Sequence, residues 1–115
     1  MRYMFLICAE TAEIAEDDGH PDRDPTSWVK EMDGRGVRSI GERLASPEDA
    51  TTVRVRDGQL LLTDGPFVET KELICGFDLI DCADLDEAIE IASKHPMARW
   101  GMVEVRPFWT PPPRS

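Results

Sequence analysis

The chain has 115 residues, a length typical of one compact domain. Apolar residues make up 41% of it and charged residues 31%, a balance that excludes a disordered chain and a membrane-embedded one. The formal net charge of −10 opposes binding to the phosphates of nucleic acid and to anionic membrane surfaces, so we expect neither partner.

The first apolar segment, residues 3–9, is too short to cross a membrane, and no signal-peptide cleavage pattern follows it. We therefore expect a cytoplasmic protein. The three cysteines are an odd number, and none lies at the two-residue separation of a zinc or redox motif. Each lies in an apolar, strand-like run, which favours buried free thiols. They are Cys8, Cys75 and Cys82.

The first third of the chain predicts a strand, a loop and a helix. Residues 2–9 are apolar on both alternating faces, which is typical of a central strand covered above and below. Residues 10–24 are polar and predict a loop. Asp24-Pro25 then predicts the start of a short helix, with Trp28 and Met32 in the core beneath it.

The middle of the chain predicts strands. Residues 37–44 indicate a strand only weakly, whereas residues 51–56 and 59–63 alternate clearly. The Asp57-Gly58 pair between them is a strong hairpin signal, because both residues accept the positive φ of a tight turn.

The last third predicts a second strand-helix-strand unit. Residues 73–82 indicate a long strand, and Asp84 with Glu87 forms a variant of the capping box at the start of a helix. Pro96 is expected to end that helix. Residues 102–108 predict the final strand, with apolar and charged side chains on opposite faces.

This order of elements predicts an α+β, ferredoxin-like fold, in which a β-hairpin separates two strand-helix-strand units. We expect one domain over residues 1–110 and a proline-rich tail over residues 111–115. Right-handed crossovers place both helices on one face of the sheet. Because the first strand is nevertheless apolar on both faces, we predict that a second copy covers the other face, in a homodimer.

Residues 63–72, TDGPFVETKE, followed by GFDLI at residues 76–80, resemble the signature of the DGPF subgroup of the YCII-related domain family. Four further segments are similar to that family in the same order: residues 41–44, 85–88, 95–96 and 103–107. The resemblance implies a dimeric α/β-barrel of ferredoxin-like subunits, similar in architecture to muconolactone isomerases and small monooxygenases. It implies no particular reaction. Genes of the subgroup are often found beside those of extracytoplasmic-function sigma factors.

The histidines carry little of the predicted function. In the YCII branch of the family, a histidine near the start of the first helix and an aspartate form a proposed catalytic pair, but residues 24–28, DPTSW, hold no histidine here. His20, in an acidic loop, is expected to be exposed, with a mobile acid or base as the minor alternative. His95 is interpreted as a positively charged residue at the end of the second helix. Neither has metal-ligand spacing, so we expect no metal.

Asp64 opens a turn at Gly65-Pro66, and two interpretations of it stay open. Its carboxylate either only accepts backbone hydrogen bonds within the turn, or is held by the rigid loop over a pocket as a general base or substrate anchor. In the second interpretation Phe67 covers the pocket. Lys71 belongs to a solvated charged surface or, if it points inward, neutralises a bound anion.

Glu104 and Arg106 are two residues apart on a predicted strand and therefore share a face. They are either a buried structural pair at the subunit interface or a functional pair in a cavity between the sheets. In the functional case Arg106 binds a carboxylate or enolate and Glu104 orients it. Glu42 is expected to join the same cavity.

These patterns favour a small-molecule enzyme of the isomerase or lyase kind that acts by acid–base chemistry in a cavity of the dimer, without an organic cofactor. The predicted catalytic residues are Asp64, Arg106 and Glu104, and the predicted substrate-binding residues are Glu42, Phe67 and Lys71. The alternative is a non-catalytic ligand-binding or regulatory protein, for which an extracytoplasmic-function sigma factor is a candidate partner.

Overall fold

A computed structural model describes residues 1–10, 20–65 and 73–113. Its strands are β1 (Arg2–Ala9), β2 (Arg38–Arg43), β3 (Thr51–Arg56), β4 (Gln59–Asp64), β5 (Leu73–Asp81) and β6 (Gly101–Pro107). Its α-helices are α2 (Thr26–Gly34), α3 (Leu85–Ser93) and α4 (Met97–Trp100), and short 3-10 turns cover Pro21–Arg23 and Pro47–Asp49.

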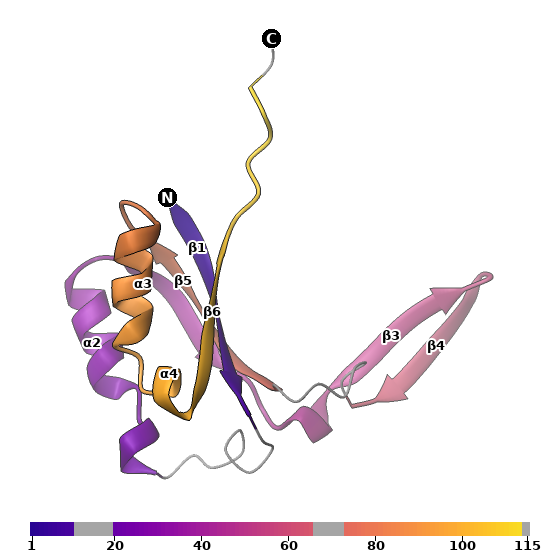
Figure 1. The fold of residues 1–115 in the computed structure, drawn as a ribbon. Coiled ribbons are helices and arrows are strands. Elements are labelled where there is room, and N and C mark those ends of the chain that lie inside the picture. Colours follow the sequence, from indigo (N-terminus) through magenta and orange to yellow (C-terminus); the bar gives the residue numbers. More distant parts are fainter. Residues whose placement is uncertain (11–19, 66–72, 114–115) are drawn as a thin grey trace.

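Four strands form one antiparallel sheet in the order β2-β5-β1-β6 (Figure 1). With the hairpin set aside, this is the order of a ferredoxin-like sheet, in which the two strand-helix-strand units interleave. β1 lies in the interior of the sheet, as its apolar sequence predicts, and pairs with β5 on one side and β6 on the other. The predicted α+β, ferredoxin-like fold is confirmed.

Both long helices pack on one face of this sheet, and the core lies between them and the strands (Figure 1). Trp28 and Met32 of α2 are buried there, as predicted, together with Ile91 of α3. They meet the inward-facing side chains of β1, of which Phe5 has no exposed surface. The indole nitrogen of Trp28 donates a hydrogen bond of 2.9 Å to the carbonyl of Ile91, which ties the two helices together.

The start of α3 is set by its N-cap residue Asp84, whereas the N-cap of α2, Pro25, makes no side-chain cap bond. Asp84 accepts the backbone N–H of Glu87 at 2.9 Å, and the Glu87 carboxylate accepts the N–H of Ala83 at 3.0 Å, so the predicted capping box variant is present. Asp24 accepts the N–H of Thr26 at 3.0 Å at the start of α2. The prediction that α3 continues to Pro96 is wrong, because α3 ends at Ser93 and α4 follows.

The predicted hairpin is confirmed and stands apart from the sheet. β3 and β4 pair only with each other among the described strands. Asp57 and Gly58 have φ values of 52° and 74°, as a two-residue hairpin turn requires. The hairpin and the C-terminal tail extend the molecule, so its radius of gyration is 16.4 Å, against about 13 Å for a compact domain of this size.

The Trp28 hydrogen bond makes a testable contribution to stability. We expect Trp28→Phe to lower the free energy of unfolding by about 1–3 kcal/mol, because the bond to Ile91 is lost and the smaller ring leaves a gap. Trp109→Phe, at a side chain that is 80% exposed, is the matched control and should change stability by less than about 0.5 kcal/mol. Urea unfolding compares the two, and equal effects would contradict the assigned role of the bond.

Candidate functional site

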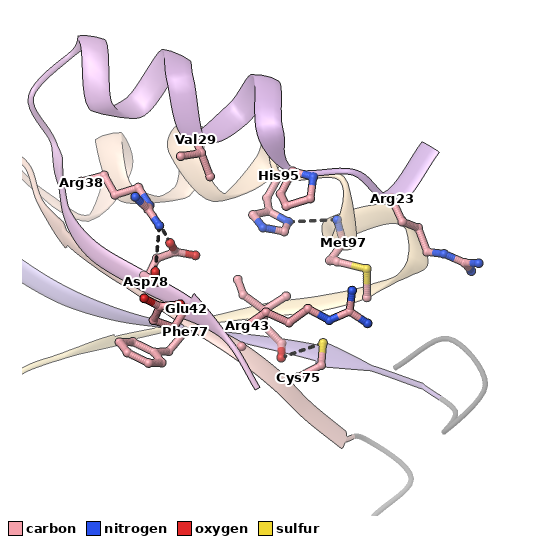
Figure 2. A pocket seen from close by; sticks show the side chains of 14 residues that line it. Arg23, Val29, Arg38, Glu42, Arg43, Cys75, Phe77, Asp78, His95 and Met97 are labelled. Carbon is pink, nitrogen blue, oxygen red and sulfur yellow. Dashed lines mark hydrogen bonds and ion pairs between the residues drawn. The ribbon is translucent and has the colours of Figure 1, made fainter. Parts of the chain in front are cut away.

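A pocket of about 190 Å³ lies between α2, the loop after α3 and the helix-covered face of the sheet (Figure 2). This volume is smaller than the roughly 300–1,000 Å³ of drug-sized ligand sites, which indicates a small metabolite. Its polar and charged lining residues are Arg23, Arg38, Glu42, Arg43, Cys75, Asp78 and His95. Its apolar lining includes Ile7, Pro25, Val29, Phe77 and Met97.

Asp78 reaches the pocket because of its place in the sheet. It lies on β5 between Phe5 of β1 and Gly41 of β2, and it faces the helices as Phe5 does. A Cβ on Gly41 would overlap the Asp78 carboxylate, so the absence of a side chain at Gly41 makes room for that carboxylate.

A β-bulge in β2 places Arg38 on the same helix-covered face of the sheet as Asp78. Residues 38 and 41 would face opposite sides of a regular strand, since side chains alternate. The register shift between Arg38 and Ile40 inserts one extra residue, so Arg38 and Gly41 both face the helices. Arg38 therefore lies beside Asp78, with its Nε 2.8 Å from the Asp78 carboxylate.

In the Arg38–Asp78 pair Asp78 is buried and Arg38 is half-buried, and the pair makes further hydrogen bonds. Asp78 is 6% exposed, and Arg38 also donates to the Gly41 carbonyl at 3.1 Å and to Asp33 at 3.3 Å. Such additional bonds are what a buried ion pair needs to offset the loss of water. Burial raises the pKa of Asp78 above its ordinary value, and this effect outweighs the opposing hydrogen bond and charge of Arg38.

His95 is a buried, neutral residue of the pocket, so its predicted role as a charged residue at the helix end is wrong. It follows the C-cap residue Lys94 and is 5% exposed. Its Nδ1 accepts the N–H of Met97 at 3.0 Å, which leaves the proton of the neutral ring on Nε2. Burial lowers the pKa of His95 from 6.5 to about 4, because it disfavours the charged ring.

The ring of His95 is held on its other side by Trp28. Their ring centroids are 4.7 Å apart in an edge-on arrangement. The same indole is fixed by its hydrogen bond to Ile91. The core of the domain therefore fixes the position of the His95 ring at the pocket.

The two ends of the pocket differ in charge. Figure 2 shows Arg38 and Asp78 at one end and Arg23 and Arg43 toward the opposite end, with His95 between them. The guanidinium of Arg23 lies 4.9 Å from the ring centroid of Trp100. In a chain with a net charge of −10, this concentration of guanidinium groups favours an anionic ligand.

His20 lies near this second end. Contrary to the expectation of an exposed side chain, it is half-buried, and its ring centroid is 5.4 Å from that of Trp100. Its Nδ1 accepts the N–H of Asp22 at 3.2 Å and so caps the 3-10 turn Pro21–Arg23 that carries Arg23.

The predicted site residues do not come together within one chain. Glu42 lines the pocket, but Asp64 is exposed at the end of β4. Glu104 and Arg106 form an exposed ion pair of 2.6 Å on β6, where their side chains are 44% and 67% exposed. Phe67 and Lys71 lie outside the residues that the structure describes. The catalytic and substrate-binding roles assigned to these residues stay predictions.

Sequence reasoning missed Arg38, Asp78 and His95. Asp78 interrupts the apolar run of β5, and a charged residue within a predicted, mostly apolar strand was the available signal. Gly41 within a predicted strand was a second signal, since such a glycine often marks a bulge or a close approach. Nothing in the spacing of Arg38 and Asp78 indicated their pairing, because it depends on the bulge.

The described residues contain neither a cluster of metal-ligating side chains nor a membrane-spanning helix. Over residues 1–10, 20–65 and 73–113, no three or more His, Cys, Asp and Glu side chains gather in a way that could hold a metal ion. In the same part of the chain, no helix is both long and apolar enough to cross a membrane.

The chain is similar to a known protein family, but this similarity identifies no reaction. A family model described as the YCII-related domain matches residues 1–110. The chain is also similar to an uncharacterised protein of Rhizobium meliloti (strain 1021), with 38% identity over 100 residues that cover 72% of this chain and 81% of that protein.

The room that Gly41 leaves for Asp78 can be tested by thermal unfolding. We expect Gly41→Ala to lower the free energy of unfolding by about 1–3 kcal/mol, because the new methyl group displaces the Asp78 carboxylate from Arg38. Gly34→Ala is the matched control, since nothing lies within 4 Å of its added Cβ, and it should be neutral or stabilise α2 by up to about 1 kcal/mol. A Gly41→Ala protein as stable as Gly34→Ala would show that the Asp78 carboxylate does not need the space at Gly41.

The neutral state of His95 predicts a loss of stability in acid. As the pH falls from about 6.5 toward 4, the unfolded chain takes up a proton at this histidine that the folded chain does not bind. Between pH 7 and pH 4.5, wild type should therefore lose about 2–3 kcal/mol more stability than His95→Asn, whose amide oxygen still accepts the Met97 N–H. Urea unfolding at the two pH values measures this difference. Equal losses in the two proteins would show that His95 is not buried in its neutral form.

Proposed function

The chain belongs to the YCII-related domain family, and we propose that it is an enzyme that moves a proton within a small organic carboxylate. The observation that carries this proposal is the presence of a buried carboxyl, Asp78, and a buried neutral imidazole, His95, on the walls of one small pocket. Pairs of titratable groups whose environments shift their pKa values are a common feature of acid–base sites.

The guanidinium groups of Arg23 and Arg43 support an anionic substrate. Arg presents a planar fork of donors that matches a carboxylate. The carboxylate would bind toward this end of the pocket, and the reacting carbon would then lie toward Asp78. The apolar side chains of Val29 and Met97 suit a short carbon chain between the two ends.

The proton transfer uses Asp78 as base and then as acid. The ionised Asp78 takes a proton from the carbon beside a carbonyl group of the substrate, and the electron pair moves onto the carbonyl oxygen. The Nε2–H of His95 donates a hydrogen bond to that oxygen, as a neutral imidazole can. In a substrate with a carbon–carbon double bond next to that carbon, Asp78 then returns the proton to the far carbon of the double bond as the carbonyl re-forms, which moves the double bond and completes an isomerisation. Its raised pKa strengthens it as a base.

Arg38 is a positioning residue in this scheme. Its hydrogen bond fixes one oxygen of Asp78, and its contacts with Asp33 and Gly41 fix the guanidinium in turn. No organic cofactor has a role in these steps. A non-catalytic sensor would bind a carboxylate in the same pocket without any proton transfer.

The protein is further proposed to be a homodimer. The sheet face opposite the helices is uncovered and largely apolar, with Ile40 and Ile74 each 49% exposed and Met102 37% exposed. Met4 and Leu6 of β1 lie on this same face. A second copy of the chain would remove this surface from water.

Proton exchange in D₂O tests the proposed reaction without a known product. We expect wild type to exchange the proton beside the carbonyl of at least one member of a panel of small oxo-carboxylates, followed by ¹H NMR. Asp78→Asn should reduce the exchange rate by about 100-fold or more, because the amide keeps the shape but not the base. Asp81→Asn, at an exposed carboxylate of the same strand β5, is the matched control and should keep most of the rate.

The binding of the same panel separates an enzyme from a sensor. Carboxylates that raise the melting temperature without exchange would support a sensor and contradict the enzyme. Exchange that persists in Asp78→Asn would contradict the role of Asp78. The absence of both binding and exchange across the panel would contradict the proposed substrate class.

A further inference from the structure

The hairpin of β3 and β4, called the arm below, projects from the sheet (Figure 1). It follows the edge strand β2 and leads back into β5. Figure 1 shows it extending on the side of the sheet that faces away from α2 and α3. It therefore points toward the side on which a second copy would cover the open sheet face.

One face of the arm is apolar and uncovered. Val53 pairs with Leu62 and Val55 pairs with Leu60, so these four side chains share one face. They are between 58% and 64% exposed. On the opposite face Leu61 pairs with Arg54 and is only 37% exposed. The apolar face is thus the more exposed of the two.

An uncovered arm of this kind needs a partner to be stable. An isolated two-stranded hairpin is marginally stable in water, and packing of an apolar face is what makes such a unit persist. The base of the arm is tied by short bonds, from Gly65 N–H to the Ala50 carbonyl at 2.7 Å and from the Thr52 hydroxyl to the Gly65 carbonyl at 2.8 Å. These bonds join the two ends of the arm to each other but cover none of its apolar face.

Charge favours a second copy of this chain as the partner. Within residues 51–64, Arg54 and Arg56 balance Asp57 and Asp64, so the arm is neutral in a chain with a net charge of −10. Two acidic bodies repel each other. A neutral arm therefore approaches another copy with less repulsion than the acidic surface of the chain as a whole.

We propose that the arm packs against a second copy of the chain, beside the open sheet face of that copy. The contact is made by the apolar face of the arm, which consists of Val53, Val55, Leu60 and Leu62. This inference rests on the proposed homodimer and adds the arm to its interface. By two-fold symmetry, the arm of each copy contacts the other copy.

Sedimentation of the full chain tests the arm against a matched control. Leu60→Thr/Leu62→Thr makes the apolar face polar, while Gln59→Thr/Leu61→Thr places the same residue type on the opposite face of the same strand. We expect wild type to be a dimer and the first variant to have a dimer dissociation constant at least about tenfold higher. The control should stay within about threefold of wild type.

A photocross-linking measurement covers the case in which a variant fails to fold. Benzoylphenylalanine in place of Leu62 should cross-link to a second copy, and the same group in place of Leu61 should not. A wild type that stays monomeric up to about 100 μM would contradict the dimer and the arm together. A dimer that neither variant weakens, with no cross-link from position 62, would contradict the arm and leave the dimer standing. Equal weakening by both variants would contradict docking through the apolar face.

Discussion

The buried ion pair between Arg38 and Asp78 is the interaction on which the candidate site depends. Two charges on the helix-covered face of a sheet are tolerated only when they are paired and further bonded. The bulge in β2 and the missing side chain at Gly41 provide that geometry. Because the pair occupies the face that otherwise holds the core, it opens a polar pocket within an apolar layer.

The core borders the pocket, and some residues belong to both. Trp28 links α2 to α3 through Ile91 and also holds the ring of His95. Ile7 continues the buried side chains of β1 and lines the pocket. The packing that stabilises the domain therefore also fixes the groups that would react, as precise acid–base chemistry requires.

Much of the fold could be predicted from the sequence, and the reasons are local. The apolar run of β1 placed it inside the sheet, Asp57-Gly58 specified the hairpin, and Asp84 with Glu87 specified the start of α3. Each of these signals depends on residues close together in the chain. The handedness of the crossovers then placed both helices on one face of the sheet.

The candidate site could not be predicted in the same way. Arg38 and Asp78 are 40 residues apart, and their contact depends on a bulge that strand periodicity does not reveal. His95 follows a helix, so the sequence favoured a surface position, whereas the turn into α4 buries it. Glu104 and Arg106 share a face as predicted, but within one chain that face is on the other side of the sheet from the pocket.

The titration of the Asp78 carboxyl carbon by ¹³C NMR tests the central claim most directly. If burial dominates over the charge of Arg38, the titration midpoint lies above the ordinary value of 3.8 and rises further in Arg38→Gln. A midpoint at or below 3.8 that Arg38→Gln leaves unchanged would show that Asp78 is solvated and unpaired, and it would contradict the site described above.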